Sequence, residues 1–236
     1  MSQSAVPRLR DLPPVRYVRD PEPVHFPEEE EVPEGYVHLL LRTFLFELLQ
    51  FVLGESNSVN SDQFVYWNAR SPKRCLSPDV FVRMNTPQSA VGSWKTWERG
   101  GPPDLAVEII SPNEGDGIEW EEKLLRYHEL GVRELIRFDP EDPPGARLRA
   151  WDRIKEDLVE RQVEGETTHC ATLRLTWAVR PIKKWPVALR LLDADGNLVL
   201  NEAETEARAR EAETRAREAA EARVRELEEE LRRRGG

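Results

Sequence analysis

Two carboxylates and a lysine in the middle of the chain have the chemistry of a metal-dependent hydrolytic site. Asp79 lies in the segment Ser-Pro-Asp-Val (77–80), and Glu108 lies inside the apolar, β-branched run 104–110. A charge in such a strand is costly to bury unless it is paired or binds a metal. Carboxylates from neighbouring strands form a hard oxygen site suited to Mg²⁺, which can hold a phosphodiester and lower the pKa of a bound water. Lys123, placed near that water, would stabilise the transition-state charge.

These residues also have structural interpretations. Asp79 could be a turn acid at the end of a strand, and Lys123 could be a solvated lysine of a helix. Asp104, next to Pro103, could bind the metal or cap the start of its strand, and the sequence does not separate these two roles. Glu108 is the strongest candidate, because a strand interior gives no other reason for a charge.

Apolar periodicity predicts the elements that must position these residues. In chain order they are a helix over 34–53, strands over 63–67 and 76–84, a strand over 104–110, a helix over 118–130 and a strand over 132–138. The first two strands are expected to form an antiparallel pair. The last three elements form a strand–helix–strand unit, whose strands normally pair in parallel. Further strands are expected over 146–151, 157–163 and 172–179, followed by a hairpin that joins 187–192 to 198–200.

Three side chains on the predicted helices have ambiguous roles. His38 and Glu47 lie on the first helix and are expected to be packed or solvated, although Glu47 could reach the site. Tyr127 lies one turn after Lys123 on the same helix face. We expect it to pack, with lining of the cleft as the alternative.

Composition limits the classes of protein that the chain can be. The net charge is −10, which argues against a broad basic face for nucleic acid. Two cysteines without metal spacing favour a reduced, cytoplasmic protein. We find no run of about 18 apolar residues, so we expect no membrane span. A local basic patch could still offset the acidity, and its candidates are Arg70, Lys73, Arg74, Arg83, Lys95 and Arg99.

The two ends of the chain differ from its centre in composition. Residues 1–33 are rich in proline and glutamate and predict an extended or partly disordered lead. Residues 202–234 hold 11 Glu and 9 Arg and predict a long charged helix. Within it, Ala220, Val224, Leu227 and Leu231 form a short coiled-coil seam. A solvated single helix and a dimerisation element account equally well for this pattern.

Several segments together resemble a known family of bacterial proteins. They are Ser-Pro-Asp-Val at 77–80, Trp-Glu-Arg-Gly at 97–100, Pro-Asp-Leu-Ala-Val-Glu-Ile-Ile-Ser-Pro at 103–112, Lys-Leu-Leu-Arg-Tyr at 123–127, Leu-Gly-Val-Arg-Glu-Leu at 130–135 and Asp-Pro at 139–140. This combination is similar to the restriction-endonuclease family of the Uma-two type, within the PD-(D/E)xK nuclease superfamily. The superfamily pattern expects a lysine where this chain has Ile110, and the resemblance implies that Lys123 on the next helix replaces it.

The resemblance implies a fold, a cofactor and a set of site residues. The fold would be of the α/β (α+β) class, with a restriction-endonuclease-like mixed central sheet flanked by helices over 34–200. The charged composition, rather than the resemblance, adds the long C-terminal helix over 201–236. The cofactor would be Mg²⁺ or Mn²⁺. The catalytic residues would be Asp79, Glu108 and Lys123, and the metal ligands Asp79 and Glu108. Asp104 is kept as a further candidate metal ligand on its position alone, beside its alternative role as the cap of the strand.

Two functional readings follow from these features. The first is a cytoplasmic, metal-dependent endonuclease that hydrolyses nucleic acid, with DNA as the expected substrate, no membrane partner, and a homodimer formed through the core or the C-terminal helix. The alternative is an inactive nuclease-fold scaffold that acts as an interaction protein through its C-terminal helix. They differ on whether Asp79 and Glu108 converge within reach of one metal ion.

Overall fold

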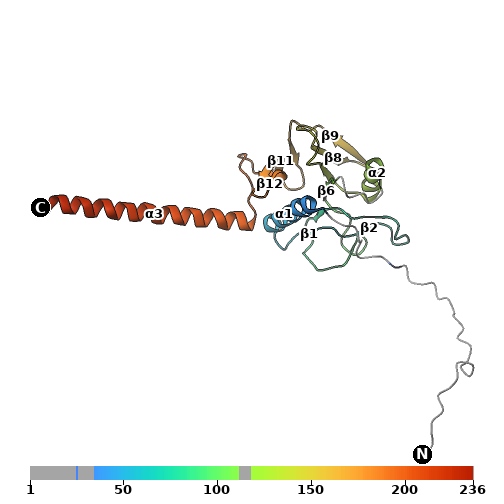
Figure 1. Cartoon of the computed structure of the whole chain (residues 1–236). Helices are drawn as coiled ribbons and strands as arrows, with labels where there is room; N and C mark the ends of the chain where they lie inside the picture. The colour runs from blue at the N-terminus through green and yellow to red at the C-terminus, as the bar shows by residue number, and fades with distance from the viewer. Residues whose placement is uncertain (1–24, 26–34, 112–117, 236) are drawn as a thin grey trace, which may run out of the picture.

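A six-stranded mixed sheet forms the centre of the protein in this computed structural model, which describes residue 25, residues 35–111 and residues 118–235 (Figure 1). In spatial order its strands are β1 (Ser58–Asn60), β4 (Val80–Arg83), β6 (Leu105–Ile109), β7 (Glu134–Phe138), β8 (Leu148–Ile154) and β9 (Asp157–Arg161). β6 and β7 are parallel and are connected by α2 (Trp120–Leu130), whereas the other neighbours are antiparallel. The predicted parallel strand–helix–strand unit is therefore confirmed.

Two smaller sheets flank the central one. The first contains β10 (Thr167–Cys170), β11 (Leu175–Ile182) and β12 (Trp185–Leu192), and the second contains β3 (Cys75–Leu76), β2 (Val65–Tyr66) and β5 (Trp94–Lys95). The sequence did not predict β1, β5 or β10. Beyond β12, the predicted hairpin is represented by a single bridge between Leu192 and Leu198.

The strand predicted over 76–84 is wrong as a single element. Residues 75–76 form β3, which pairs with β2, while residues 80–83 form β4, which enters the central sheet. The break falls at Ser77, Pro78 and Asp79. Proline has no backbone N–H and cannot continue a ladder, so the chain leaves one sheet and joins the other at this point. Asp79 thereby comes to stand at the beginning of β4.

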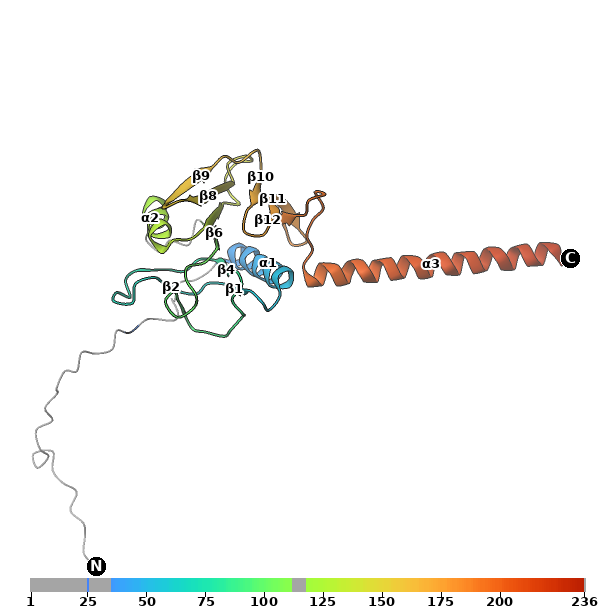
Figure 2. The same ribbon diagram turned by 180° about the vertical axis from the view of Figure 1, so that it is seen from behind.

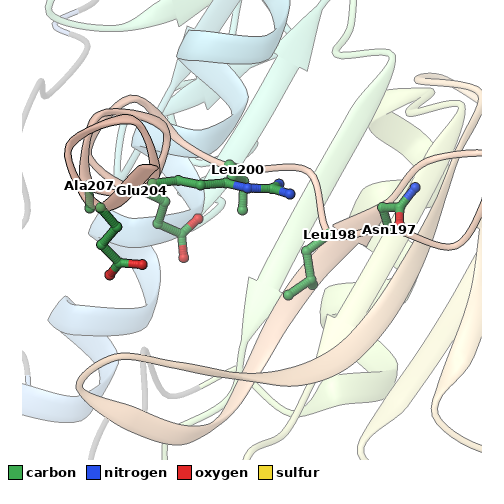
Figure 3. Close-up of a pocket in the computed structure, with 7 residues that line it drawn as sticks. Asn197, Leu198, Leu200, Glu204 and Ala207 are labelled. Atoms are coloured by element: carbon green, nitrogen blue, oxygen red, sulfur yellow. The ribbon is translucent and has the colours of Figure 1, made fainter. Parts of the chain in front are cut away.

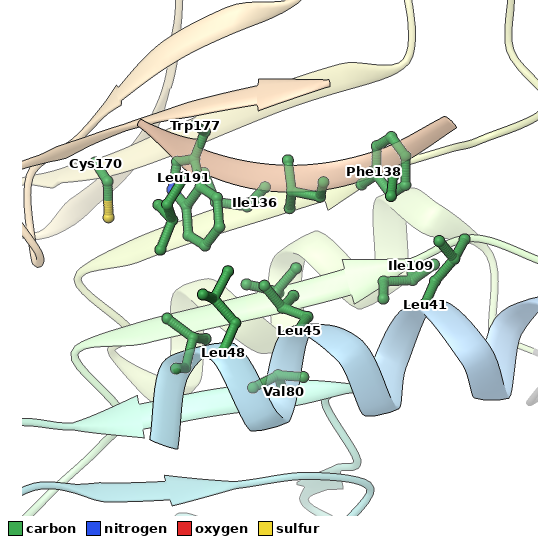
Figure 4. Packing of buried hydrophobic residues seen from close by; sticks show 14 of the residues in the cluster. Leu41, Leu45, Leu48, Val80, Ile109, Ile136, Phe138, Cys170, Trp177 and Leu191 are labelled. Carbon is green, nitrogen blue, oxygen red and sulfur yellow. The ribbon is translucent and has the colours of Figure 1, made fainter. Parts of the chain in front are cut away.

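The two faces of the central sheet are covered by different helices. Leu105, Val107 and Ile109 of β6 belong to the core that contains the leucines of α1 (Tyr36–Leu53), as Figure 4 shows for part of this cluster. Ala106 belongs to a second core, which includes Tyr127 of α2. Successive residues of β6 thus face α1 and α2 alternately, as expected for a buried strand.

α1 modifies the expectation that no segment could span a membrane. By length and composition this helix could cross one, with a mean hydropathy of 1.5. A core helix meets the same test, and Leu41, Leu45, Leu48 and Leu49 of α1 are buried against the sheets.

α3 (Glu202–Arg234) confirms the predicted long C-terminal helix and projects away from the sheets (Figures 1 and 2). Its first turn is closed by a capping box between Asn201 and Glu204. Glu204 also accepts two hydrogen bonds of 2.9 Å from the buried Arg190. Beside this anchor lies a hollow of about 390 Å³, lined by the 197–200 turn and the start of α3 (Figure 3).

The predicted domain boundaries, at 33/34 and 200/201, stay predictions. The N-terminal lead lies outside the described residues, apart from position 25.

Candidate active site

Strand register places Asp79 opposite Glu108. Val80 of β4 pairs with Val107 of β6 in an antiparallel ladder, so the next position outward on each strand brings the two acids face to face. Side-chain alternation directs both toward α2, the side where Phe81 and Ala106 pack. Both are buried, with exposed fractions of 8% and 3%. The sequence-based expectation of acids on neighbouring strands therefore agrees with the geometry.

α2 supplies two donors to Glu108. Lys123 Nζ lies 2.8 Å from Oε2 of Glu108, and the hydroxyl of Tyr127 donates to Oε1. Positions i and i+4 share one helix face, which explains why both side chains reach the same carboxylate. Tyr127 is fully buried, so it both packs and contacts the site. The sequence indicated this role only through its spacing from Lys123.

Burial raises the pKa of Glu108 above its ordinary value, and the nearby charge of Asp79 raises it further, while Lys123 opposes the shift. Ionised carboxylates that are buried side by side repel one another and lose hydration. The site thus carries two acids next to one lysine, an imbalance that a bound cation would relieve.

Asp79 is held by the backbone of β6 and by a side chain of α1. The N–H of Ile109 donates to Oδ2 of Asp79 at 2.6 Å, and Nε2 of His38 lies 2.8 Å from Oδ1. His38 is therefore a site residue that sequence reasoning treated as a packed or solvated one. Its contact spans 41 positions of the chain (79 minus 38), and no local pattern signals such a contact. Glu47 is exposed and lies nine residues further along α1, about 13 Å from His38.

The structure does not bring Asp104 to this site. Asp104 lies four residues before Glu108, about 13 Å away at the other end of β6. Its Oδ2 accepts from the Met84 N–H at 2.9 Å and from Arg83 at 3.2 Å, and its Oδ1 lies 3.3 Å from Arg133. Asp104 therefore anchors the strand start, which is the structural one of its two expected roles, and we leave it out of the metal site.

Two residues of the basic patch expected from sequence, Arg83 and Arg74, do not lie at the acids. Arg83 donates to Asp104 and to the carbonyls of Gly100 and Pro102, at the opposite end of β6. Arg74 pairs at 2.6 Å with Glu129, in the last turn of α2. Charges that hold the fold together at that end do not supply a binding surface next to Asp79 and Glu108.

The residues present fit a hard divalent cation. In the part of the chain that the structure describes, no group of three or more His, Cys, Asp or Glu side chains is arranged to hold a metal ion. Mg²⁺, however, is usually bound through one or two carboxylates and completes its shell with water and substrate phosphate. The adjacent carboxylates of Asp79 and Glu108 meet that requirement.

A mixed sheet that presents two buried acids on adjacent strands, with a lysine from the following helix, is the arrangement that the resemblance to restriction endonucleases leads one to expect. The model of the Uma2 family, described as "Putative restriction endonuclease", matches residues 28–180, and the chain belongs to this family.

One solved structure is similar in outline to the chain. It is that of "a putative nuclease belonging to DUF820" from Anabaena variabilis ATCC 29413, with 12% identity and a TM-score of 0.44, and the match covers 61% of this chain and 76% of the other. No curated protein matches the chain significantly.

Proposed function

We propose that the protein is a metal-dependent endonuclease that hydrolyses phosphodiester bonds of DNA with Mg²⁺ or Mn²⁺. The observation that carries the proposal is the convergence of Asp79, Glu108 and Lys123 on one face of the central sheet. Membership of the restriction-endonuclease family supports nuclease chemistry. DNA as the substrate, and the identity of the ion, are our own extension.

Each side chain has a defined task in this proposal. Asp79 and Glu108 would hold the ion, which when bound would stabilise charge on the phosphodiester and lower the pKa of a water. Lys123, an ammonium within 2.8 Å of Glu108, is placed to stabilise negative charge that develops on the phosphate oxygens.

The surrounding groups keep these side chains in position. Tyr127 fixes the second oxygen of Glu108, while His38 and the N–H of Ile109 fix Asp79. The two acids are therefore held before any ligand binds, which lowers the cost of organising the site.

The test combines metal titration with DNA cleavage. Calorimetric titration with Mg²⁺ and with Mn²⁺ would be run on the wild type, Glu108→Ala and Asp104→Asn, and a supercoiled plasmid would be incubated with the same samples. We expect metal binding and metal-dependent nicking in the wild type and in Asp104→Asn, and neither in Glu108→Ala. Asp104→Asn is a matched control because it alters an equally buried acid on the same face of β6.

Two results would contradict the proposal. Absence of metal binding by the wild type would remove its basis. Equal loss of binding in both variants would show that the effect comes from damage to β6 rather than from the site.

The scaffold alternative concerns α3, and the homodimer was expected through either the core or this helix, where Val224, Leu227 and Leu231 are exposed. We propose that this stripe mediates self-association. Sedimentation over a range of concentrations should detect a dimer in the wild type and a monomer in Leu227→Glu. The scaffold alternative would be favoured if the wild type bound no metal and deletion of residues 202–236 abolished the biological function of the protein. The cytoplasmic location expected from the two cysteines stays a prediction.

A further inference from the structure

Four charged residues, namely the two acids of the site and two arginines, form a row across the central sheet. Asp79 stands opposite Glu108, Glu108 pairs with Arg137 of β7, and Arg137 pairs with Arg149 of β8. All four lie on the face covered by α2, because Leu135 and Trp151, two positions from the arginines, pack in the α2 core. The row therefore runs from two acids to two arginines across four adjacent strands.

The spacing of the row suits a nucleic-acid strand. Neighbouring strands are about 4.8 Å apart. The backbone of Arg137 therefore lies one strand spacing from that of Glu108 and two strand spacings from that of Asp79. A phosphodiester held at the acids would have the rest of its strand within reach of a guanidinium on this side. Arginine is suited to this task because its planar donors match phosphate oxygens.

Arg137 is held in place while keeping hydrogen-bonding capacity. Nη2 donates to Asp139 at 2.9 Å and Nη1 to Asp142 at 3.3 Å, and the guanidinium lies 5.5 Å from the ring centre of Trp120. These two bonds use two of the five N–H groups of a guanidinium. The side chain is 16% exposed, so it is ordered by its neighbours and still accessible.

Arg149 is engaged differently. Both Nε and Nη2 donate to the carboxylate of Glu160, at 2.8 and 3.0 Å, in a bidentate pair. Its guanidinium also lies 4.9 Å from the ring centre of Trp151. Arg149 uses two adjacent donors in one bidentate pair, the geometry that a phosphate would require, whereas Arg137 forms single-bond ion pairs with two different carboxylates, Asp139 and Asp142. Arg137 is therefore the better-placed donor of the row.

We propose that Arg137 binds a backbone phosphate of the nucleic acid next to the phosphodiester at Asp79 and Glu108. The inference rests on the proposed function and adds a substrate-binding residue to it. It would place a guanidinium beside the acids of a chain with a net charge of −10, in which Arg83 and Arg74 of the expected basic patch lie elsewhere.

The test measures binding of a fluorescent DNA duplex by the full chain, with Ca²⁺ in place of Mg²⁺ to slow cleavage. The variants are Arg137→Gln, Arg137→Lys and, as a matched loss of one positive charge, Arg180→Gln on the exposed side of β11. We expect Arg137→Gln to weaken binding about tenfold, the size of one charge-assisted hydrogen bond. The dependence of log Kd on log salt should fall by about one unit. Arg137→Lys should recover part of the affinity, and Arg180→Gln should bind like the wild type.

Mg²⁺ titration of the same proteins separates this inference from the proposed function. Unchanged Mg²⁺ binding together with weaker DNA binding in Arg137→Gln supports a phosphate contact. If Arg137→Gln and Arg137→Lys keep the affinity and salt dependence of the wild type, the inference is wrong while the nuclease proposal stands. If the wild type binds neither metal nor DNA, the proposed function fails and this inference fails with it.

Discussion

The two ends of β6 carry acids that are equally buried but have different charged neighbours. Asp104 and Glu108 are each 3% exposed and point to the same face of one strand. Asp104 lies between Arg83 and Arg133, so its charge is matched or exceeded by nearby positive charge. Glu108 lies beside Asp79 and pairs with one lysine, Lys123, while Asp79 contacts His38. Burial is the same at the two positions, whereas the local charge balance differs, and this difference is the reason for proposing a functional role for Glu108 and not for Asp104.

The charge balance also explains where free energy is gained and lost in this sheet. At the Asp104 end, hydrogen bonds and opposite charges offset the cost of burying the carboxylate. At the Glu108 end the cost is not fully offset without a cation, which is typical of sites that bind ligands.

The sharpest test of this contrast removes a positive charge from each end. Lys123→Met should lower the rate of plasmid nicking about 10²- to 10³-fold, because it removes the charge that faces the developing negative charge. Arg83→Met should leave the nicking rate per folded molecule nearly unchanged and lower the melting temperature. Nicking assays and thermal melts on both variants measure these effects. Equal loss of nicking in the two variants would abolish the distinction between the ends.

Removal of each acid should lower the free energy of unfolding more at the Asp104 end than at the Glu108 end. Asp104→Ala should lower the free energy of unfolding by about 3 kcal/mol, since it leaves the partly buried Arg83 without its carboxylate. Glu108→Gln should cost much less at neutral pH, because it removes a poorly compensated charge. Urea unfolding monitored by tryptophan fluorescence would compare the two. A larger loss in Glu108→Gln than in Asp104→Ala would contradict the comparison.

The pH dependence of stability should identify the unbalanced acid. The pKa of Glu108 is raised in the folded state, so the folded protein binds this proton more tightly than the unfolded chain does. The resulting stability is present below the ordinary pKa of 4.5 and is lost as pH rises through the folded value. Relative to Glu108→Gln, the metal-free wild type should therefore become less stable as pH rises from about 4 toward neutrality. A difference that is constant with pH would show that Glu108 titrates normally.

The smallest expected effect concerns the second donor to Glu108. Tyr127→Phe keeps the packing of α2 and removes one hydrogen bond, so stability should fall by about 1 kcal/mol. Mg²⁺ affinity and nicking should change by less than tenfold, because Lys123 still holds the other oxygen. Calorimetry on Tyr127→Phe measures the affinity. A complete loss of metal binding would place the tyrosine hydroxyl in a more direct role.

The parts of the structure that sequence could predict depend on local pattern. The unit β6–α2–β7 has a buried run, a helix that ends at a glycine and a second buried run, and all three signals lie within about 35 residues. Glu108 stood out for the same reason, because it is a charge inside one of these buried runs, whereas Asp79 and Lys123 were favoured as site residues through the family resemblance.

The parts that sequence could not predict depend on register and on long-range pairing. His38 reaches Asp79 from the other side of the sheet, and its position on α1 resembles that of any packed residue. Arg137 becomes a neighbour of Glu108 only when β6 and β7 are aligned residue by residue. Asp104 was ambiguous because its role depends on Arg83, which is 21 positions away. Each of these contacts is decided by assembly of the sheet rather than by the residues around it.

The anchor at the base of α3 makes the helix a lever. At 33 residues it is about 50 Å long, so a tilt of 10° at Asn201 would move its far end by about 9 Å. Arg190, which is buried and lies 4.9 Å from the ring centre of Phe44, ties the first turn of the helix to α1 through Glu204. α1 also carries His38 of the site. A force applied at the far end of α3 would therefore act, through Glu204 and Arg190, on α1, the helix whose His38 contacts Asp79.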